Sequence, residues 1–161
     1  MESTCSVDTS KLVPIASMVG DDMEDTKLLK QMAAEAASFL SSHHWCGSVD
    51  GQFLGYGVGG VVGVFLCLIS PTAEDVDSCL WVVVGDLPPA YLITEENPDP
   101  ASALDAYIDE MSSWVEAVEK GESTDDLIPV NVLPTMELAE QLRGRLVFLR
   151  ERILPLIPSN A

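Results

Sequence analysis

The densest group of side chains that could bind a metal or act as a nucleophile is four consecutive residues: His43, His44, Trp45 and Cys46. A zinc site needs four ligands at recurrent spacing, and a cysteine nucleophile needs a histidine beside it in space. Nothing in the spacing of these residues demands either site. We therefore interpret them as the carboxyl end of a helix, where histidines complement the helix dipole and Trp45 packs. No motif indicates a catalytic residue, a metal or a cofactor, and we expect none.

A glycine-rich segment formally matches the GxGxxG pattern of phosphate-binding loops: Gly55-Tyr56-Gly57-Val58-Gly59-Gly60. Such a loop needs a helix directly after it, because the helix amino end supplies N–H groups and a favourable dipole. The run that follows here, Val61 to Ile69, is strand-like. The segment therefore predicts a bent or bulged strand. A close backbone contact with a ligand is the alternative, since glycine permits such an approach.

Asp86 directly follows the apolar run Leu80 to Val84, and functional carboxylates often lie in loops at strand ends. We interpret it as a turn residue before two prolines. The alternative is a small enzyme or ligand-binding protein whose site forms where a few residues converge. These residues are His43, His44, Gly57, Gly59 and Asp86. That hypothesis requires a histidine within about 3 Å of Asp86 or Cys46.

Four carboxylates follow the back of a strongly indicated helix: Asp105, Asp109, Glu116 and Glu119. Asp99 is a good N-cap for this helix, Pro100 a good first-turn residue and Gly121 a good residue to end it. Like charges four residues apart destabilise a helix by roughly 0.2–0.5 kcal/mol per pair. A face that carries them is consistent with docking of a basic protein. A solvated helix back is the alternative.

The charge of the chain is strongly one-sided. Its 161 residues include 26 acidic and 8 basic ones, which gives a net charge of −18. Between Gln31 and Leu142, Lys120 is the only basic residue. This balance argues against a nucleic-acid backbone or an anionic membrane surface as a partner. We therefore predict a non-enzymatic acidic interaction domain, similar to an immunity or inhibitor protein, that binds a basic protein.

The order of the predicted elements indicates one α+β domain over residues 25–158, after a partly ordered segment, 1–24. We expect an antiparallel β-meander of three to five strands with one helix before it and two helices after it. The predicted helices run from about 25 to 42, from 100 to 120 and from 135 to 154. The predicted strands are Trp45–Val49 and Gln52–Val58 around a hairpin turn at Asp50-Gly51, then Val61–Ile69, Leu80–Val84 and the edge segment Ala90–Thr94. Two strands are apolar on both faces, so they need cover on both sides or an interface, which leaves room for a homodimer.

Cysteine usage and the start of the chain predict a cytoplasmic protein. The four cysteines form no CxxC pair, and we expect all of them to be reduced. The first residues are acidic, and the apolar stretch after them is broken by Pro14 and Ser17, unlike a signal peptide. Residues 51–73 carry no charge, so a membrane-spanning helix is an alternative there. Six glycines and the absence of flanking cations favour a β-hairpin instead.

One segment resembles a known sequence pattern: Leu80-Trp81-Val82-Val83-Val84-Gly85-Asp86-Leu87-Pro88-Pro89-Ala90-Tyr91. It is similar to a segment of an uncharacterised family of small acidic bacterial proteins. The resemblance extends over roughly residues 45–155. It implies no activity, and it assigns no site residue.

Overall fold

The computed structural model describes residues 5, 7–128, 130 and 135–158 and contains one antiparallel sheet of five strands. The strands follow one another in space as they do in the chain: β1 (Val13–Pro14), β2 (Cys46–Val58), β3 (Val62–Pro71), β4 (Cys79–Gly85) and β5 (Ala90–Ile93). The helices are α1 (Met23–Ser41), α2 (Pro100–Lys120) and α3 (Met136–Phe148). A π-helical turn, Leu149–Ile153, and a 3₁₀ turn, Leu154–Leu156, continue α3. The predicted α+β meander is confirmed.

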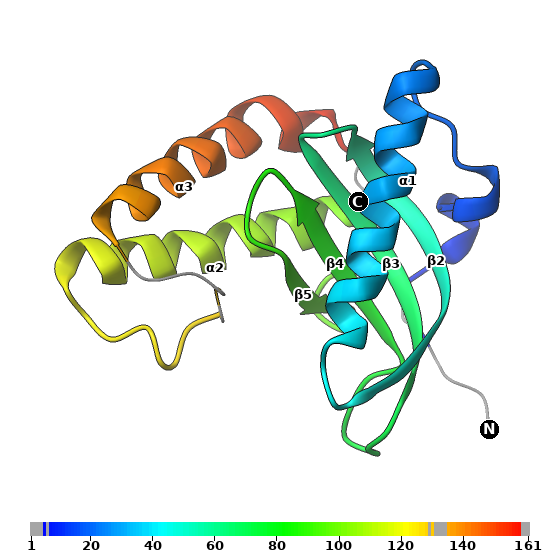
Figure 1. Ribbon diagram of the computed structural model, residues 1–161, viewed down its shortest axis with the longest axis horizontal. Helices are drawn as coiled ribbons and strands as arrows, with labels where there is room; N and C mark the ends of the chain where they lie inside the picture. Colours follow the sequence, from blue (N-terminus) through cyan, green and yellow to red (C-terminus); the bar gives the residue numbers. More distant parts are fainter. Residues whose placement is uncertain (1–4, 6, 129, 131–134, 159–161) are drawn as a thin grey trace.

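Helices cover both faces of the sheet (Figure 1). On β3, the side chains of Phe65, Cys67 and Ile69 belong to the core under α1. Those of Val64 and Leu66 belong to the core shared with α2 and α3. A strand buried on both faces must be apolar at every position, which explains the uninterrupted apolar run in the sequence.

The ends of α2 follow the sequence signals. Asp99 accepts a hydrogen bond from the Ser102 N–H at 2.8 Å, and the Ser102 hydroxyl completes a capping box. Gly121 ends the helix in the left-handed conformation, with φ 70°. These contacts lie within a few residues of each other, so local sequence is enough to place them.

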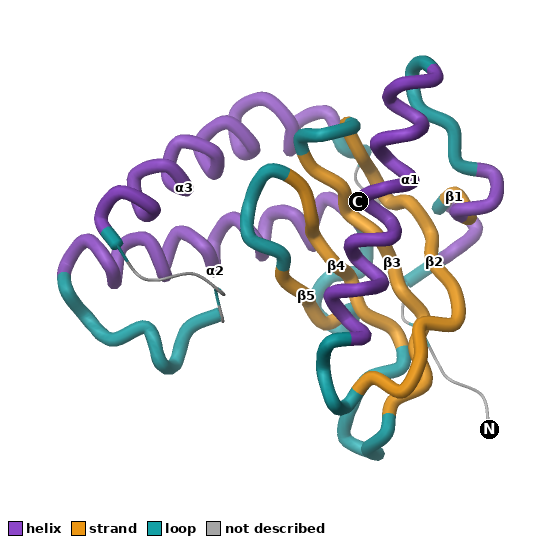
Figure 2. The backbone as a smooth tube through the Cα atoms, viewed as in Figure 1, coloured by secondary structure: helices purple, strands orange, loops and turns teal. Residues whose placement is uncertain are grey.

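The predicted hairpin turn at Asp50-Gly51 is wrong, because β2 runs through this point as one strand (Figure 2). The pairing with β3 shifts between Val49 and Gly51, as in a β-bulge. The Asp50 carboxylate accepts hydrogen bonds from the Ser48 hydroxyl at 2.7 Å and the Ser70 hydroxyl at 2.6 Å. These bonds lower the pKa of Asp50. The carboxylate thus links β2 to β3 where a turn was expected.

The prediction that all four cysteines are reduced is also wrong. Cys5 and Cys79 form a disulfide across 74 positions of the chain, whereas Cys46 and Cys67 are free and buried. Spacing along a sequence does not reveal such a pairing. The described part of the N-terminal segment also adds the edge strand β1 and buries Val7, Leu12 and Met18.

The uncharged run over residues 51–73 lies in β2, the turn after it, β3 and the two residues that follow β3. Val61 donates its N–H to the Val58 carbonyl at 2.9 Å and so closes the turn at Gly59-Gly60. Within the described part of the chain, no helix has the length and apolar character needed to cross a membrane.

Candidate functional site

The carboxylates predicted to dock a partner lie along the seam between α2 and α3. The Arg150 guanidinium contacts Asp105 at 3.0 Å and Asp109 at 2.7 Å. Arg143 forms an ion pair with Glu119, and the pKa of Arg143 is raised by that hydrogen bond. Three of the four acidic residues therefore have a cationic partner within the chain. A role in docking for these residues stays a prediction.

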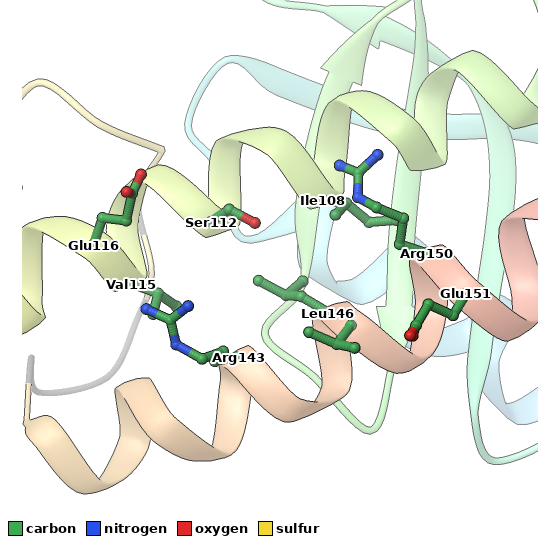
Figure 3. A pocket seen from close by; sticks show the side chains of 9 residues that line it. Ile108, Ser112, Val115, Glu116, Arg143, Leu146, Arg150 and Glu151 are labelled. Atoms are coloured by element: carbon green, nitrogen blue, oxygen red, sulfur yellow. The ribbon is translucent and has the colours of Figure 1, made fainter.

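A groove of about 300 Å³ lies along the same seam (Figure 3). Ile108, Val115 and Leu146 give it apolar walls, and Arg143 of α3 and Arg150 of the π-helical turn reach toward α2. Both arginines are bound to α2 carboxylates, so their charges already serve to hold the two helices together. The groove therefore offers no uncompensated cation to a ligand.

His43 lies in a group of four rings, which we call the aromatic cluster: Phe39, His43, Trp45 and Tyr91. The His43 ring centroid is 4.7 Å from that of Trp45 and 5.5 Å from that of Tyr91. His43 Nδ1 lies 2.9 Å from the Phe39 carbonyl oxygen, at the carboxyl end of α1. His43 and Trp45 thus pack at the carboxyl end of α1, as the sequence predicts. The contact of both rings with Tyr91 of β5 was not predicted.

His44 next to it is exposed and takes part through its backbone. Its carbonyl accepts a hydrogen bond from the Thr72 hydroxyl at 3.1 Å, and the Thr72 N–H bonds to the Trp45 carbonyl at 2.9 Å. These two bonds fasten the β3–β4 connection to the start of β2.

The glycine-rich segment is a bulged strand, as predicted, and its close approach is to α1. Pairing shifts between Leu54 and Tyr56, at Gly55. A Cβ on Gly57 would lie 2.6 Å from the Leu29 Cδ2 of α1, so any other residue would have to displace that buried side chain. The Gly59 N–H donates to the Asp25 carboxylate at 2.7 Å. A helix of the same chain therefore occupies the space where a phosphate was considered.

Asp86 lies with the helices on the other face of the sheet. Its carboxylate is 3.2 Å from Arg145 of α3, and both residues line a cavity of about 310 Å³ beside Trp114. The Asp86 side chain thus belongs to the α3 side, whereas His43 packs under α1. The structure does not bring the five residues of the alternative site together.

The two free cysteines also lack the features of a nucleophile. Burial raises the pKa of Cys67 to about 12, and burial raises the pKa of Cys46 as well. A thiol with a raised pKa carries little thiolate at neutral pH. Among the described residues, no group of three or more His, Cys, Asp or Glu side chains is placed to hold a metal ion.

A different set of carboxylates gathers at one end of the sheet, and we call it the acidic sheet end. Its members are Glu74, Asp75, Asp77, Glu95 and Glu96, all of them exposed. Leu80 pairs with Ile93, so the connection before β4 and the connection after β5 leave the sheet side by side. Figure 1 shows α1 ending toward the same end of the sheet. Sequence reasoning missed this surface because the two acidic segments are separated by all of β4 and β5.

The acidic sheet end differs from the α2 face in its partners. Within the described part of the chain, none of its five side chains forms an ion pair. The aromatic cluster lies beside it, since Thr72 ties the first acidic connection to Trp45 and Tyr91 precedes the second. The surface therefore combines half-buried aromatic rings with uncompensated negative charge.

No protein-family model, no curated protein and no solved structure matches this chain.

Proposed function

We propose that this protein is a non-enzymatic interaction domain that binds a basic protein, in the manner of an immunity or inhibitor protein. The observation that carries the proposal is the acidic sheet end: exposed carboxylates without ion-pair partners in the described chain, beside the aromatic cluster. Uncompensated charge accelerates encounter with an oppositely charged partner and selects for it. Tyrosine and tryptophan supply much of the binding energy at protein interfaces.

The aromatic cluster suits a cationic partner in particular. An arginine or lysine side chain over the face of Trp45 or Tyr91 gains cation–π energy in addition to its attraction to carboxylates. Arginine also binds carboxylates through two parallel hydrogen bonds. We infer a partner whose contact surface is rich in arginine or lysine.

The test is affinity capture from the source organism's lysate with two matched charge variants. The first variant neutralises the acidic sheet end: E74Q, D75N, D77N, E95Q and E96Q. The control neutralises five other exposed carboxylates that have no ion pair in the described chain: E110Q, E122Q, D125N, D126N and E137Q. Both variants change the net charge by the same amount.

We expect the unmodified chain to capture a stoichiometric basic protein that is released as salt shortens the range of electrostatic attraction to below about 10 Å. The first variant should lose this protein and the control should retain it. Equal retention by both variants would refute the acidic sheet end as the binding surface. Capture of no salt-sensitive basic protein would leave solubility as the reason for the charge.

The compartment of the interaction follows from the state of Cys5 and Cys79. A cytoplasmic location is our proposal from the sequence. The Cys5–Cys79 disulfide weighs against it, because disulfides are rare in the reduced cytosol and persist in oxidising environments. Alkylation of thiols at the moment of cell lysis, followed by mass spectrometry, distinguishes the two states.

A further inference from the structure

Strand β5 is the last strand of the sheet, and no strand of the described chain pairs with its outer edge. Its four residues pair with β4 in a regular register: Leu80 with Ile93, Trp81 with Leu92, Val82 with Tyr91 and Val83 with Ala90. Which backbone groups of β5 remain open depends on the direction in which each residue points its N–H and C=O.

Two hydrogen bonds on the other side of β4 decide this direction. Ile69 donates its N–H to the Ser78 carbonyl at 2.8 Å, and Asp86 donates to the Val61 carbonyl at 3.1 Å. In an antiparallel pair, residues that point both groups at the partner alternate with residues that point both away. Ser78 and Asp86 therefore point their backbone groups at β3, and so does every second residue between them: Leu80, Val82 and Val84. The residues in between, Trp81 and Val83, point their N–H and C=O groups at β5.

The partners of Trp81 and Val83 on β5 are Leu92 and Ala90, which therefore use their backbone groups on β4. It follows that Tyr91 and Ile93 point their N–H and C=O groups away from the sheet. One of these four groups is occupied, because the Asn97 side chain donates to the Ile93 carbonyl at 2.8 Å. The N–H of Tyr91, the C=O of Tyr91 and the N–H of Ile93 have no hydrogen-bond partner in the described chain.

The surroundings of this edge are aromatic and acidic. Tyr91 belongs to the aromatic cluster, and Ile93 is 40% exposed. Glu95 and Glu96 directly follow the strand. The sequence has no lysine or arginine from Gln31 to Glu119, so no basic residue lies near β5 along the chain.

We propose that the outer edge of β5 accepts an extended, basic segment of the partner as an additional strand. Open main-chain groups provide hydrogen bonds in this binding mode, and alternate side chains provide specificity. Lysine or arginine residues of the segment lie beside Glu95 and Glu96, and its apolar side chains lie against Tyr91 and Ile93. This inference rests on the proposed function and names the way in which the partner binds.

The probe is a synthetic hexapeptide of alternating lysine and valine, added to the isotope-labelled, disulfide-bonded full chain. Amide hydrogen exchange is measured by NMR at Tyr91 and Ile93. A fully N-methylated peptide with the same side chains tests whether hydrogen bonding is needed, and a peptide of alternating glutamate and valine tests the charge. We expect the first peptide to slow exchange at both amides at least about tenfold, since strand pairing protects amides according to its free energy. The two control peptides should leave exchange unchanged.

A substitution in the protein provides a second measurement. Ile93→Pro removes one outward N–H and no hydrogen bond to β4, and proline is tolerated on the outer edge of a sheet. Ile93→Ala shortens the same side chain and keeps the N–H. We expect Ile93→Pro to weaken peptide binding about threefold to tenfold relative to Ile93→Ala, as expected for one lost hydrogen bond.

Strand addition is overturned if the basic peptide leaves exchange at Tyr91 and Ile93 unchanged, or if the N-methylated peptide binds equally well. The peptide controls are independent of whether Ile93→Pro folds. A captured partner that needs the acidic sheet end but leaves these two amides exchanging freely would retain the proposed function and refute strand addition alone.

Discussion

Three glycine-to-alanine substitutions separate the effect of a positive φ from the effect of the close approach between the end of β4 and the start of β3. Gly85 ends β4 with φ 143°, and an added Cβ would press against the Val61 carbonyl oxygen and lie 2.9 Å from the Val62 Cα. Gly121 has φ 70° with no atom within 4 Å of an added Cβ. Gly144, in α3, also has no atom within that distance, and its φ is not in the left-handed range. Gly85 therefore combines a positive φ with a backbone clash, Gly121 has a positive φ without a clash, and Gly144 has neither.

The expected free-energy changes follow from these settings. Gly144→Ala should stabilise the protein by about 0.5–1 kcal/mol, because alanine favours the helix. Gly121→Ala should destabilise it by about 1–2 kcal/mol, the cost of a left-handed conformation with a Cβ. Gly85→Ala should cost about 2–6 kcal/mol, the sum of backbone strain and of displacing Val61 and Val62 from the ladder.

Urea unfolding of the disulfide-bonded protein, followed by circular dichroism, measures all three changes on one scale. In thermal unfolding of the same variants, the midpoint temperature of a chain of this size should fall by about 2–4 °C for each kcal/mol lost. Gly144→Ala controls for the general effect of removing a glycine. If Gly85→Ala costs no more than Gly121→Ala, the close approach of β3 to the end of β4 is refuted.

Three further predictions concern thiols, alkaline pH and ion pairs. Under denaturing conditions without reductant, iodoacetamide should modify Cys46 and Cys67 alone, as read by intact mass spectrometry; four modifications would contradict the disulfide. Burial raises the pKa of Cys67 from 9.0 to about 12 and raises that of Tyr107. Since each group resists ionisation only in the folded state, the free energy of unfolding should fall above about pH 9 through Cys67 and above about pH 10 through Tyr107, by up to about 1.4 kcal/mol per pH unit for each group. In a Cys67→Ala, Tyr107→Phe variant, the free energy of unfolding measured by urea titration should fall less steeply with pH. An unchanged pH dependence would show that other groups cause it. Arg150→Gln should lower the free energy of unfolding by at most about 1 kcal/mol, and by less in 1 M salt, because both carboxylate partners are on the surface. A larger, salt-independent loss would show that Arg150 stabilises α3 by packing.

The parts of the fold that could be predicted depend on neighbours in the sequence. Asp99 caps α2 through Ser102, and Gly121 ends it, within one turn in each case. The Asp50-Gly51 pair is an equally strong local signal, yet it lies inside β2. There the Ser70 hydroxyl, on the neighbouring strand, binds Asp50 and supports a bulge instead of a turn. A local preference is overridden where a distant segment supplies the hydrogen-bond partner.

The candidate site depended on longer-range contacts and was mostly invisible in the sequence. Arg150 binds Asp105 across 45 positions, and the acidic face of α2 could not be distinguished from a free one by spacing along the helix. Tyr91 joins His43 and Trp45 because the meander returns β5 to the end of α1. The local sequence around Tyr91, Pro88-Pro89-Ala90-Tyr91, does not indicate these ring contacts, because they follow from the order of the strands.

Competition for charge decides where a basic partner can bind this acidic chain. A cation that approached Asp109 would have to displace Arg150, which is already 2.7 Å away and is held by the π-helical turn that continues α3. Such an exchange replaces one ion pair by another and gains little. At Glu95 or Glu96 no cation of the described chain has to leave, so the full attraction is available to the partner. We therefore propose the surface where charge is uncompensated as the docking surface, even though α2 carries as many carboxylates.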